Sequence, residues 1–79
     1  MNAPEITSRI ETVFTRVFGA RTQFAIGLSR LDEPRWSSLK HMEFLVGLEQ
    51  EFGVRFDGAD ATDMTSIAEV VERVGSKLA

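Results

Sequence analysis

Residues 37–54 read SSLKHMEFLVGLEQEFGV, and this stretch predicts a helix together with both of its ends. Residues 38–51 read as a helix to which several residues supply apolar side chains. They are Leu39, Met42, Leu45, Val46 and Leu48, with Phe52 closing the stretch. Gly53 then suits the residue that follows a helix. Two adjacent serines, Ser37 and Ser38, stand before the apolar run, where a hydroxyl can cap the helix.

Helical spacing also marks the segments on either side. Residues 4–18 carry one apolar stripe, and Gly19 follows it as a helix-ending glycine would. Residues 65–79 carry another, opened by the capping-box pattern of Ser66 and Glu69. The two stripes consist of Ile6, Ile10, Val13, Phe14, Val17 and Phe18, and of Ile67, Val70, Val71, Val74 and Leu78.

The segments between these helices have no sustained period. Residues 20–36 predict a long ordered loop whose apolar residues, Trp36 among them, anchor it to the core. Residues 57–64 are polar, with room for one short helical turn. The fold class is therefore all-α. We expect a single domain over residues 1–79, a small four-helix bundle with three main helices, one short helix and a long first loop.

Composition excludes several classes of function. The 79 residues include no Cys, which excludes disulfides, thiolate zinc sites and a cysteine nucleophile. A net charge of −3 argues against a nucleic-acid partner. No segment approaches the roughly 18 apolar residues of a membrane span, and the first residues lack the features of a signal peptide. We expect a cytoplasmic monomer with no membrane span.

The polar residues give little support to two possible chemical functions, a catalytic serine–histidine pair and a calcium-binding loop. Ser38 and His41 lie three residues apart and could share a helix face, but no acid partner is evident, so a solvated His41 and no catalytic residue are expected. Asp57, Asp60 and Asp63 do not match a calcium-binding loop. They predict a solvated turn with a helix cap and no metal.

The remaining notable side chains receive structural interpretations. Three are expected in the core rather than in a cofactor site: Met42, Phe44 and Met64. Four are expected on the solvated face of the 38–51 helix: Lys40, Glu43, Glu49 and Glu51.

Two short motifs stand at a definite distance from each other. Residues 38–39 read SL, residues 48–53 read LEQEFG, and Trp36 precedes the serine pair. In this order the chain resembles the acyl carrier protein family, which has D-S-L at the start of its second helix and E-E-F-G at the end of it. The resemblance covers residues 36–78 in detail and the first helix by pattern only. It implies the four-helix carrier bundle.

The resemblance also implies a function. Ser38 would carry 4'-phosphopantetheine through a phosphodiester, and the thiol of that arm would hold acyl groups as thioesters, in a fatty acid, polyketide or related lipid pathway. Ser37 would then be the helix cap. Partners would be a phosphopantetheinyl transferase and acyl-loading and acyl-transfer enzymes. The residues expected to meet them are Ser37, Leu39, Lys40, Met42, Glu43 and Glu49.

The chain departs from the family at two positions beside the motif. Ser37 replaces the family's aspartate, and Lys40 occupies a position that is often acidic. Residues 32–51 still hold five acidic and two basic side chains. We therefore expect an acidic docking face with a neutral to basic beginning, and a dedicated set of partners. The alternative is a carrier-like helical interaction module that is never modified.

Overall fold

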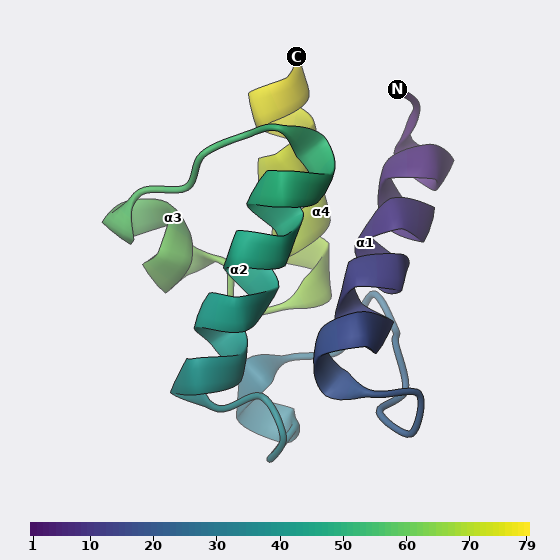
Figure 1. Ribbon diagram of the computed structural model, residues 1–79, viewed down its shortest axis with the longest axis vertical. Helices are drawn as coiled ribbons and strands as arrows, with labels where there is room; N and C mark the ends of the chain where they lie inside the picture. Colours follow the sequence, from purple (N-terminus) through teal and green to yellow (C-terminus); the bar gives the residue numbers. More distant parts are fainter.

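Four helices form the fold, and the chain contains no strand (Figure 1). The computed structural model describes all 79 residues. The helices are α1 (Ala3–Phe18), α2 (Ser38–Phe52), α3 (Gly58–Asp63) and α4 (Ile67–Leu78). The all-helical bundle expected from the sequence is thus confirmed, with α3 as its short helix. One element was not expected: a 3-10 turn, η1 (Arg30–Asp32), lies in the long first loop.

The three long helices run along the longest axis of the molecule (Figure 1). α1 runs antiparallel to α2 and α4, so both termini lie at one end of the bundle. The first loop and the beginning of α2 lie at the opposite end, and α3 lies to one side. None of the helices combines the length and the hydrophobicity needed to cross a bilayer.

Local signals set the ends of α2. The Ser37 hydroxyl accepts the Lys40 N–H at 3.2 Å, which satisfies one of the free donors of the first turn. At the other end, Gly53 has φ 66° and ψ 34°, the left-handed conformation that glycine adopts without a steric cost. Both ends agree with the sequence prediction.

The capping box predicted at the start of α4 forms only in part. The Ser66 hydroxyl accepts the Glu69 N–H at 3.2 Å, as expected of the cap. The Glu69 carboxylate, however, accepts the hydroxyls of Ser66 and Thr65 rather than the Ser66 N–H. The Thr65 hydroxyl, next to the Ser66 cap, therefore donates a second hydrogen bond to the Glu69 carboxylate.

Aromatic rings form the part of the core that joins the first loop to the helices. Phe14 of α1 contacts Phe44 of α2 and Trp36 of the loop, with ring centroids 5.8 and 6.5 Å apart. Trp36 is buried and so anchors the loop as predicted. α1 and α2 also approach closely at Gly47, where an added Cβ would lie 2.8 Å from Val13 Cγ1. These contacts fix the middle of α2 against α1.

The prediction for three apolar side chains is right for two. Phe44 and Met64 are fully buried, but Met42 is 54% exposed, so its assignment to the core was wrong. Helical period alone could not distinguish Phe44 from Met42, because α2 carries apolar residues on both its inner and outer faces. Which face is covered depends on where α1, α3 and α4 pack.

The charged residues of α2 are less solvated than predicted. Only Glu43 of the four is exposed. Glu51 forms an ion pair with Arg9 of α1 at 2.8 Å, and Glu49 accepts the Phe56 N–H at 2.8 Å. The lysine, Lys40, donates to the Val17 carbonyl in the last turn of α1 at 3.2 Å. That carbonyl lies at the negative end of the α1 dipole, where a cation is favourable.

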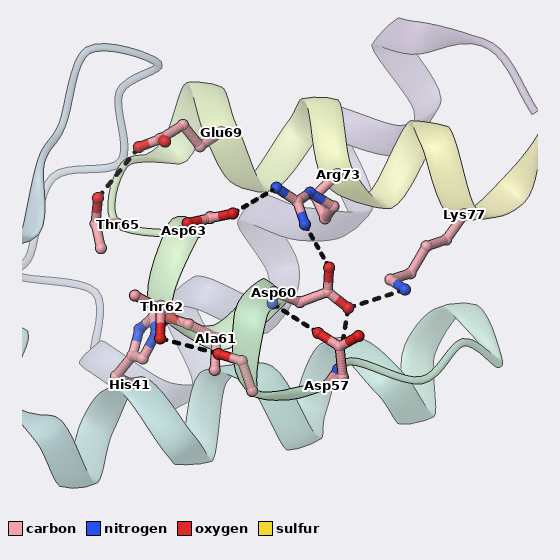
Figure 2. A network of polar contacts seen from close by, with 11 residues as sticks. His41, Asp57, Asp60, Ala61, Thr62, Asp63, Thr65, Glu69, Arg73 and Lys77 are labelled. Carbon is pink, nitrogen blue, oxygen red and sulfur yellow. Dashed lines mark hydrogen bonds and ion pairs between the residues drawn. The ribbon is translucent and has the colours of Figure 1, made fainter.

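The acidic residues at and within α3 form a network of polar contacts, in which Asp57 and Asp63 are exposed as predicted and Asp60 is not (Figure 2). Asp57 and Asp60 form a reciprocal capping box, and the Asp60 carboxylate is paired with Lys77 and Arg73 of α4. Arg73 also contacts Asp63 at 3.2 Å. The predicted cap is confirmed, but Asp60 is buried, so its predicted solvation was wrong. A carboxylate can be buried here because two cations from α4 compensate it.

This pairing changes the protonation of both partners. The Lys77 ammonium, the Asp57 N–H and the Arg73 guanidinium hold the pKa of the Asp60 carboxyl far below its usual value. Asp60 and Asp63 in turn raise the pKa of Arg73. Both shifts favour the charged forms, so the network joins α3 to α4 most firmly when all its members are ionised.

His41 is buried, which contradicts the expectation of a solvated side chain. Its Nδ1 accepts the Trp36 indole N–H at 2.9 Å, and its Nε2 lies 2.8 Å from the Ala61 carbonyl oxygen. An indole can only donate, so Nδ1 is the acceptor and Nε2–H donates to Ala61. One neutral imidazole thereby joins the first loop, α2 and α3, which no local sequence pattern signals.

Candidate functional site

Ser38 is the first residue of α2, and its side chain is exposed at the end of the bundle away from the termini. The neighbouring Ser37 provides the cap, so the Ser38 hydroxyl is not required for that purpose. The backbone N–H groups of Ser38 and Leu39 have no partner within the protein. We expected Ser37 to cap α2, and it does. The Ser38 hydroxyl is exposed and is not used as a cap.

A cation from the first loop contacts the Ser38 hydroxyl. Arg30, the first residue of η1, donates from Nη2 to Ser38 Oγ at 2.9 Å and from Nε to the Trp36 carbonyl at 3.3 Å. The loop therefore returns to the helix end and adds a guanidinium beside the serine. Sequence reasoning missed Arg30, which lies eight residues before Ser38 in a segment without any period.

Three exposed apolar side chains lie on η1 and on the first two turns of α2. Leu31 of η1 is 95% exposed, and Leu39 and Met42 of α2 are more than half exposed. The bond between Arg30 and Ser38 joins η1 to the beginning of α2, and Leu39 and Met42 follow within the first two turns of that helix. Exposed apolar groups gathered in this way are typical of an interaction surface. Leu31 was not predicted as part of the surface.

Two other predicted docking residues lie one turn into α2. The Lys40 ammonium and the Glu43 carboxylate form an ion pair at 3.3 Å. Because Lys40 also bonds the Val17 carbonyl, its ammonium is held towards α1 and is less available to a partner. Glu43 is the more exposed member of the pair and carries the accessible negative charge.

Glu49 lies apart from the other candidates. It is eleven residues after Ser38, a distance of about 16 Å along a helix. It is half-buried, and its carboxylate accepts the N–H of Phe56, which orders the chain after α2. The structure thus brings Ser37, Ser38, Leu39, Lys40, Met42 and Glu43 together at one end of α2 and gives Glu49 a structural contact at the other.

Two shallow grooves begin on either side of Met42. The first, about 400 Å³, lies between α1 and α2 and is lined mainly by Val13, Val17, Met42 and Val46. The second, about 240 Å³, lies between α2 and α3 and includes Met42, Leu45, Val46 and Phe56. Met42, one helical turn after Ser38, borders both grooves. Apolar surface is therefore available close to the serine on two sides.

No nucleophile–base pair is formed by Ser38 and His41. Both ring nitrogens of His41 are bonded, one to Trp36 and one to Ala61, and the ring is buried. The hydroxyl of Ser38 is exposed and contacts Arg30. The spacing of three residues in the sequence therefore does not bring a base to this serine. The surroundings of Ser38 are instead cationic and apolar.

A scan against models of protein families and a search of curated proteins found no match for this chain.

Proposed function

We propose that this chain is an acyl carrier protein, a four-helix carrier bundle whose Ser38 bears 4'-phosphopantetheine. One observation carries the proposal: the Ser38 hydroxyl is exposed at the first residue of α2 while Ser37 caps the same helix. Because the hydroxyl of Ser38 is not the helix cap, it can be esterified without loss of the cap. The resemblance of residues 36–78 to the carrier family supplies the chemical class of the group.

The groups around Ser38 suit an anionic ester. The Arg30 guanidinium bonds the hydroxyl, and the unpartnered N–H groups of Ser38 and Leu39 lie at the positive end of the α2 dipole. No carboxylate contacts the Ser38 hydroxyl. The arm supplies a terminal thiol, which holds acyl groups as thioesters. The protein contributes a tether that raises the effective concentration of that thiol near a partner enzyme.

Docking of the partner enzymes is assigned to the exposed side of α2. Leu39 and Met42 offer apolar contacts there, and Glu43 offers a negative charge for a Lys or Arg of a transferase or an acyl-transfer enzyme. Glu49 was expected to take part, but its bond to Phe56 gives it a structural contact, so the charge contribution is assigned to Glu43. The grooves beside Met42 offer apolar surface to an acyl chain.

Intact-mass spectrometry tests the proposal. The wild-type protein, incubated with coenzyme A and a phosphopantetheinyl transferase, is expected to gain the mass of one phosphopantetheine group. Ser38→Ala is expected to gain nothing, whereas Ser37→Ala, the matched control, is expected to be modified. Modification that persists in Ser38→Ala, or its absence in the wild type with several transferases, would overturn the assignment.

A second candidate function uses the same surface without modification. Leu31, Leu39 and Met42 form an exposed apolar end that a protein partner can cover whether or not Ser38 is esterified. Such an interaction module would remain at its unmodified mass in the experiment above. The mass measurement therefore separates the two functions.

A further inference from the structure

Arg30 makes two side-chain hydrogen bonds that direct its guanidinium towards the start of α2. Nη2 donates to Ser38 Oγ at 2.9 Å, and Nε donates to the Trp36 carbonyl at 3.3 Å. Because Trp36 is buried among the aromatic residues of the core, its carbonyl is a fixed point. The guanidinium is therefore oriented by the protein and does not move freely on the surface.

The backbone of Arg30 is fixed as well. Its N–H donates to the Thr65 carbonyl at 2.8 Å, next to an isolated antiparallel bridge between Ser29 and Ser66. The Ser29 hydroxyl caps the short turn by accepting the Leu31 N–H at 3.2 Å. The loop that carries Arg30 is thus bonded to the segment leading into α4, which limits how far the guanidinium can withdraw from Ser38.

The charge of Arg30 has no carboxylate partner. The ion pairs of the protein involve Arg9, Lys40, Arg73 and Lys77, and Arg30 is in none of them. Its side chain is half-buried, and both of its acceptors are neutral oxygens. A partly desolvated cation without a counter-charge gains most from an anion placed within its reach.

From these contacts we infer that Arg30 is a phosphate-binding residue, which holds the phosphodiester joining the arm to Ser38. The inference rests on the proposed function and adds a role that the motif does not specify. In the ester, Ser38 Oγ is bonded to phosphorus, so the charged phosphate oxygens lie two bonds beyond the atom that Arg30 already contacts. The planar guanidinium presents paired donors that match two phosphate oxygens.

The other nearby cation is less suited to this position. The Lys40 ammonium is bonded to the Val17 carbonyl and to Glu43, so its charge is already compensated on the α1 side of α2. Arg30 approaches from the loop and contacts the hydroxyl itself. The consequence is that the first part of the arm is oriented by the loop, while α2 remains free to receive a partner.

A purely structural role for Arg30 makes a different prediction. If Arg30 only ties the loop to α2, its replacement destabilises the unmodified and the modified protein equally. If it binds the phosphodiester, its replacement costs more in the modified protein. The two roles are separated by a thermodynamic cycle whose two changes are the substitution of Arg30 and the modification of Ser38.

The experiment measures chemical denaturation of modified and unmodified protein for the wild type and three variants. Arg30→Gln removes the positive charge, and Arg30→Lys keeps the charge but lacks the planar guanidinium with its paired donors. Arg35→Gln is the matched control, because Arg35 is an exposed arginine of the same loop that forms no ion pair. In Arg30→Gln, the effect of modification on the unfolding equilibrium constant is expected to fall about two- to five-fold relative to the wild type, the range of a partly exposed ion pair. Arg30→Lys is expected to recover part of this difference, and Arg35→Gln is expected to show none.

A second readout, by NMR, begins with the wild-type protein and so does not depend at first on how well the variants fold. In the wild-type protein, NMR resonances of the Arg30 side-chain nitrogens are expected to shift on modification of Ser38, while those of Arg35 do not. The phosphorus resonance of the ester is expected to shift in Arg30→Gln and to keep its position in Arg35→Gln. Increased salt should reduce the difference, since it screens a partly exposed contact.

The outcomes separate this inference from the function on which it rests. A modified protein whose thermodynamic cycle shows no coupling, and whose Arg30 resonances do not respond, overturns the role of Arg30 and leaves the carrier function intact. A chain that no transferase modifies overturns the carrier function and this inference together. Coupling in Arg30→Gln with none in Arg35→Gln supports both.

Discussion

The α3–α4 side of the bundle and the Ser38 end use polar groups in opposite ways. α3 has six residues, too few to be stable as an isolated helix, and it is held by the Asp57–Asp60 capping box and by bonds of Asp60 to α4 (Figure 2). At the Ser38 end, an exposed hydroxyl has one partner, and apolar side chains lie in water. The polar groups that join α3 to α4 are paired within the protein, whereas the Ser38 end leaves a hydroxyl and apolar side chains exposed, where we propose that a partner and the arm bind.

The largest change in stability is expected when the covered and the exposed face of α2 are compared. Phe44→Ala is expected to lower the free energy of unfolding by about 3–5 kcal/mol, because the ring is fully buried among other aromatic side chains. Met42→Ala, two residues earlier on the exposed face, is expected to change it by less than about 0.5 kcal/mol. Chemical denaturation of both variants measures the difference. Similar losses in the two would mean that Met42 belongs to the core after all.

His41 tests whether the α3 side depends on closed polar contacts. His41→Leu keeps an apolar volume but leaves the buried Trp36 N–H without an acceptor and the Ala61 carbonyl without its donor. The expected loss is about 1–3 kcal/mol for each buried group left unpaired. His41→Gln, which can restore one of the two bonds, is expected to lose less. Equal stability of His41→Leu and wild type would show that these bonds contribute nothing net.

The dependence of stability on pH tests the Asp60 network. The pKa of Asp60 is held below its usual value of 3.8 by Lys77, by the Asp57 N–H and by Arg73. A lowered native pKa means that the unfolded chain takes up the proton first as the solution is acidified. The stabilising contribution of Asp60 is therefore complete at neutral pH and is lost progressively as the pH falls below about 4.

Asp60→Asn removes this contribution. The variant is expected to be less stable than wild type at pH 7, and the difference between the two is expected to narrow in acid. Denaturation curves at neutral pH and near pH 3 measure it. Asp32→Asn, which removes an exposed carboxylate that forms no ion pair, is the control and should keep the wild-type profile. A constant difference between Asp60→Asn and wild type at all pH values would contradict the assignment.

The smallest expected change in stability is at Ser37. Aspartate and serine are about equally good caps, so Ser37→Asp is expected to alter the free energy of unfolding by less than about 0.5 kcal/mol. It adds a carboxylate beside the Ser38 hydroxyl, and a general-purpose transferase is expected to modify Ser38 faster at low salt, with a gain that shrinks as salt increases. Initial rates at two salt concentrations measure this.

Ser8→Asp provides the control for added charge, since Ser8 is exposed in the first half of α1, and α1 begins at the end of the bundle opposite to the beginning of α2 (Figure 1). It should leave the modification rate unchanged. If Ser37→Asp and wild type are modified equally fast at low salt, Ser37 does not weaken recognition of this chain by a general-purpose transferase. The expectation of dedicated partners then loses its main support.

Features that depend on neighbouring residues were predictable from the sequence. The helices over residues 4–18 and 38–51, the Ser37 cap and the Gly53 ending follow from period and capping. These interactions lie within one or two helical turns, so the signal is contained in a short stretch. Ser38 could be proposed as the modified residue only through the resemblance to the carrier family, whose motif also lies within the short stretch of α2.

Only the tertiary structure decided which side chains are covered and which distant groups meet. His41 is buried because Trp36 and Ala61, five and twenty residues away, supply its two partners. Asp60 is buried because cations of α4 reach it, and Arg30 reaches Ser38 because the loop is bonded to the segment before α4. A helical period indicates that a residue lies on one face of a helix, but whether that face meets water, a ring or a charge depends on the packing of segments far apart in the chain.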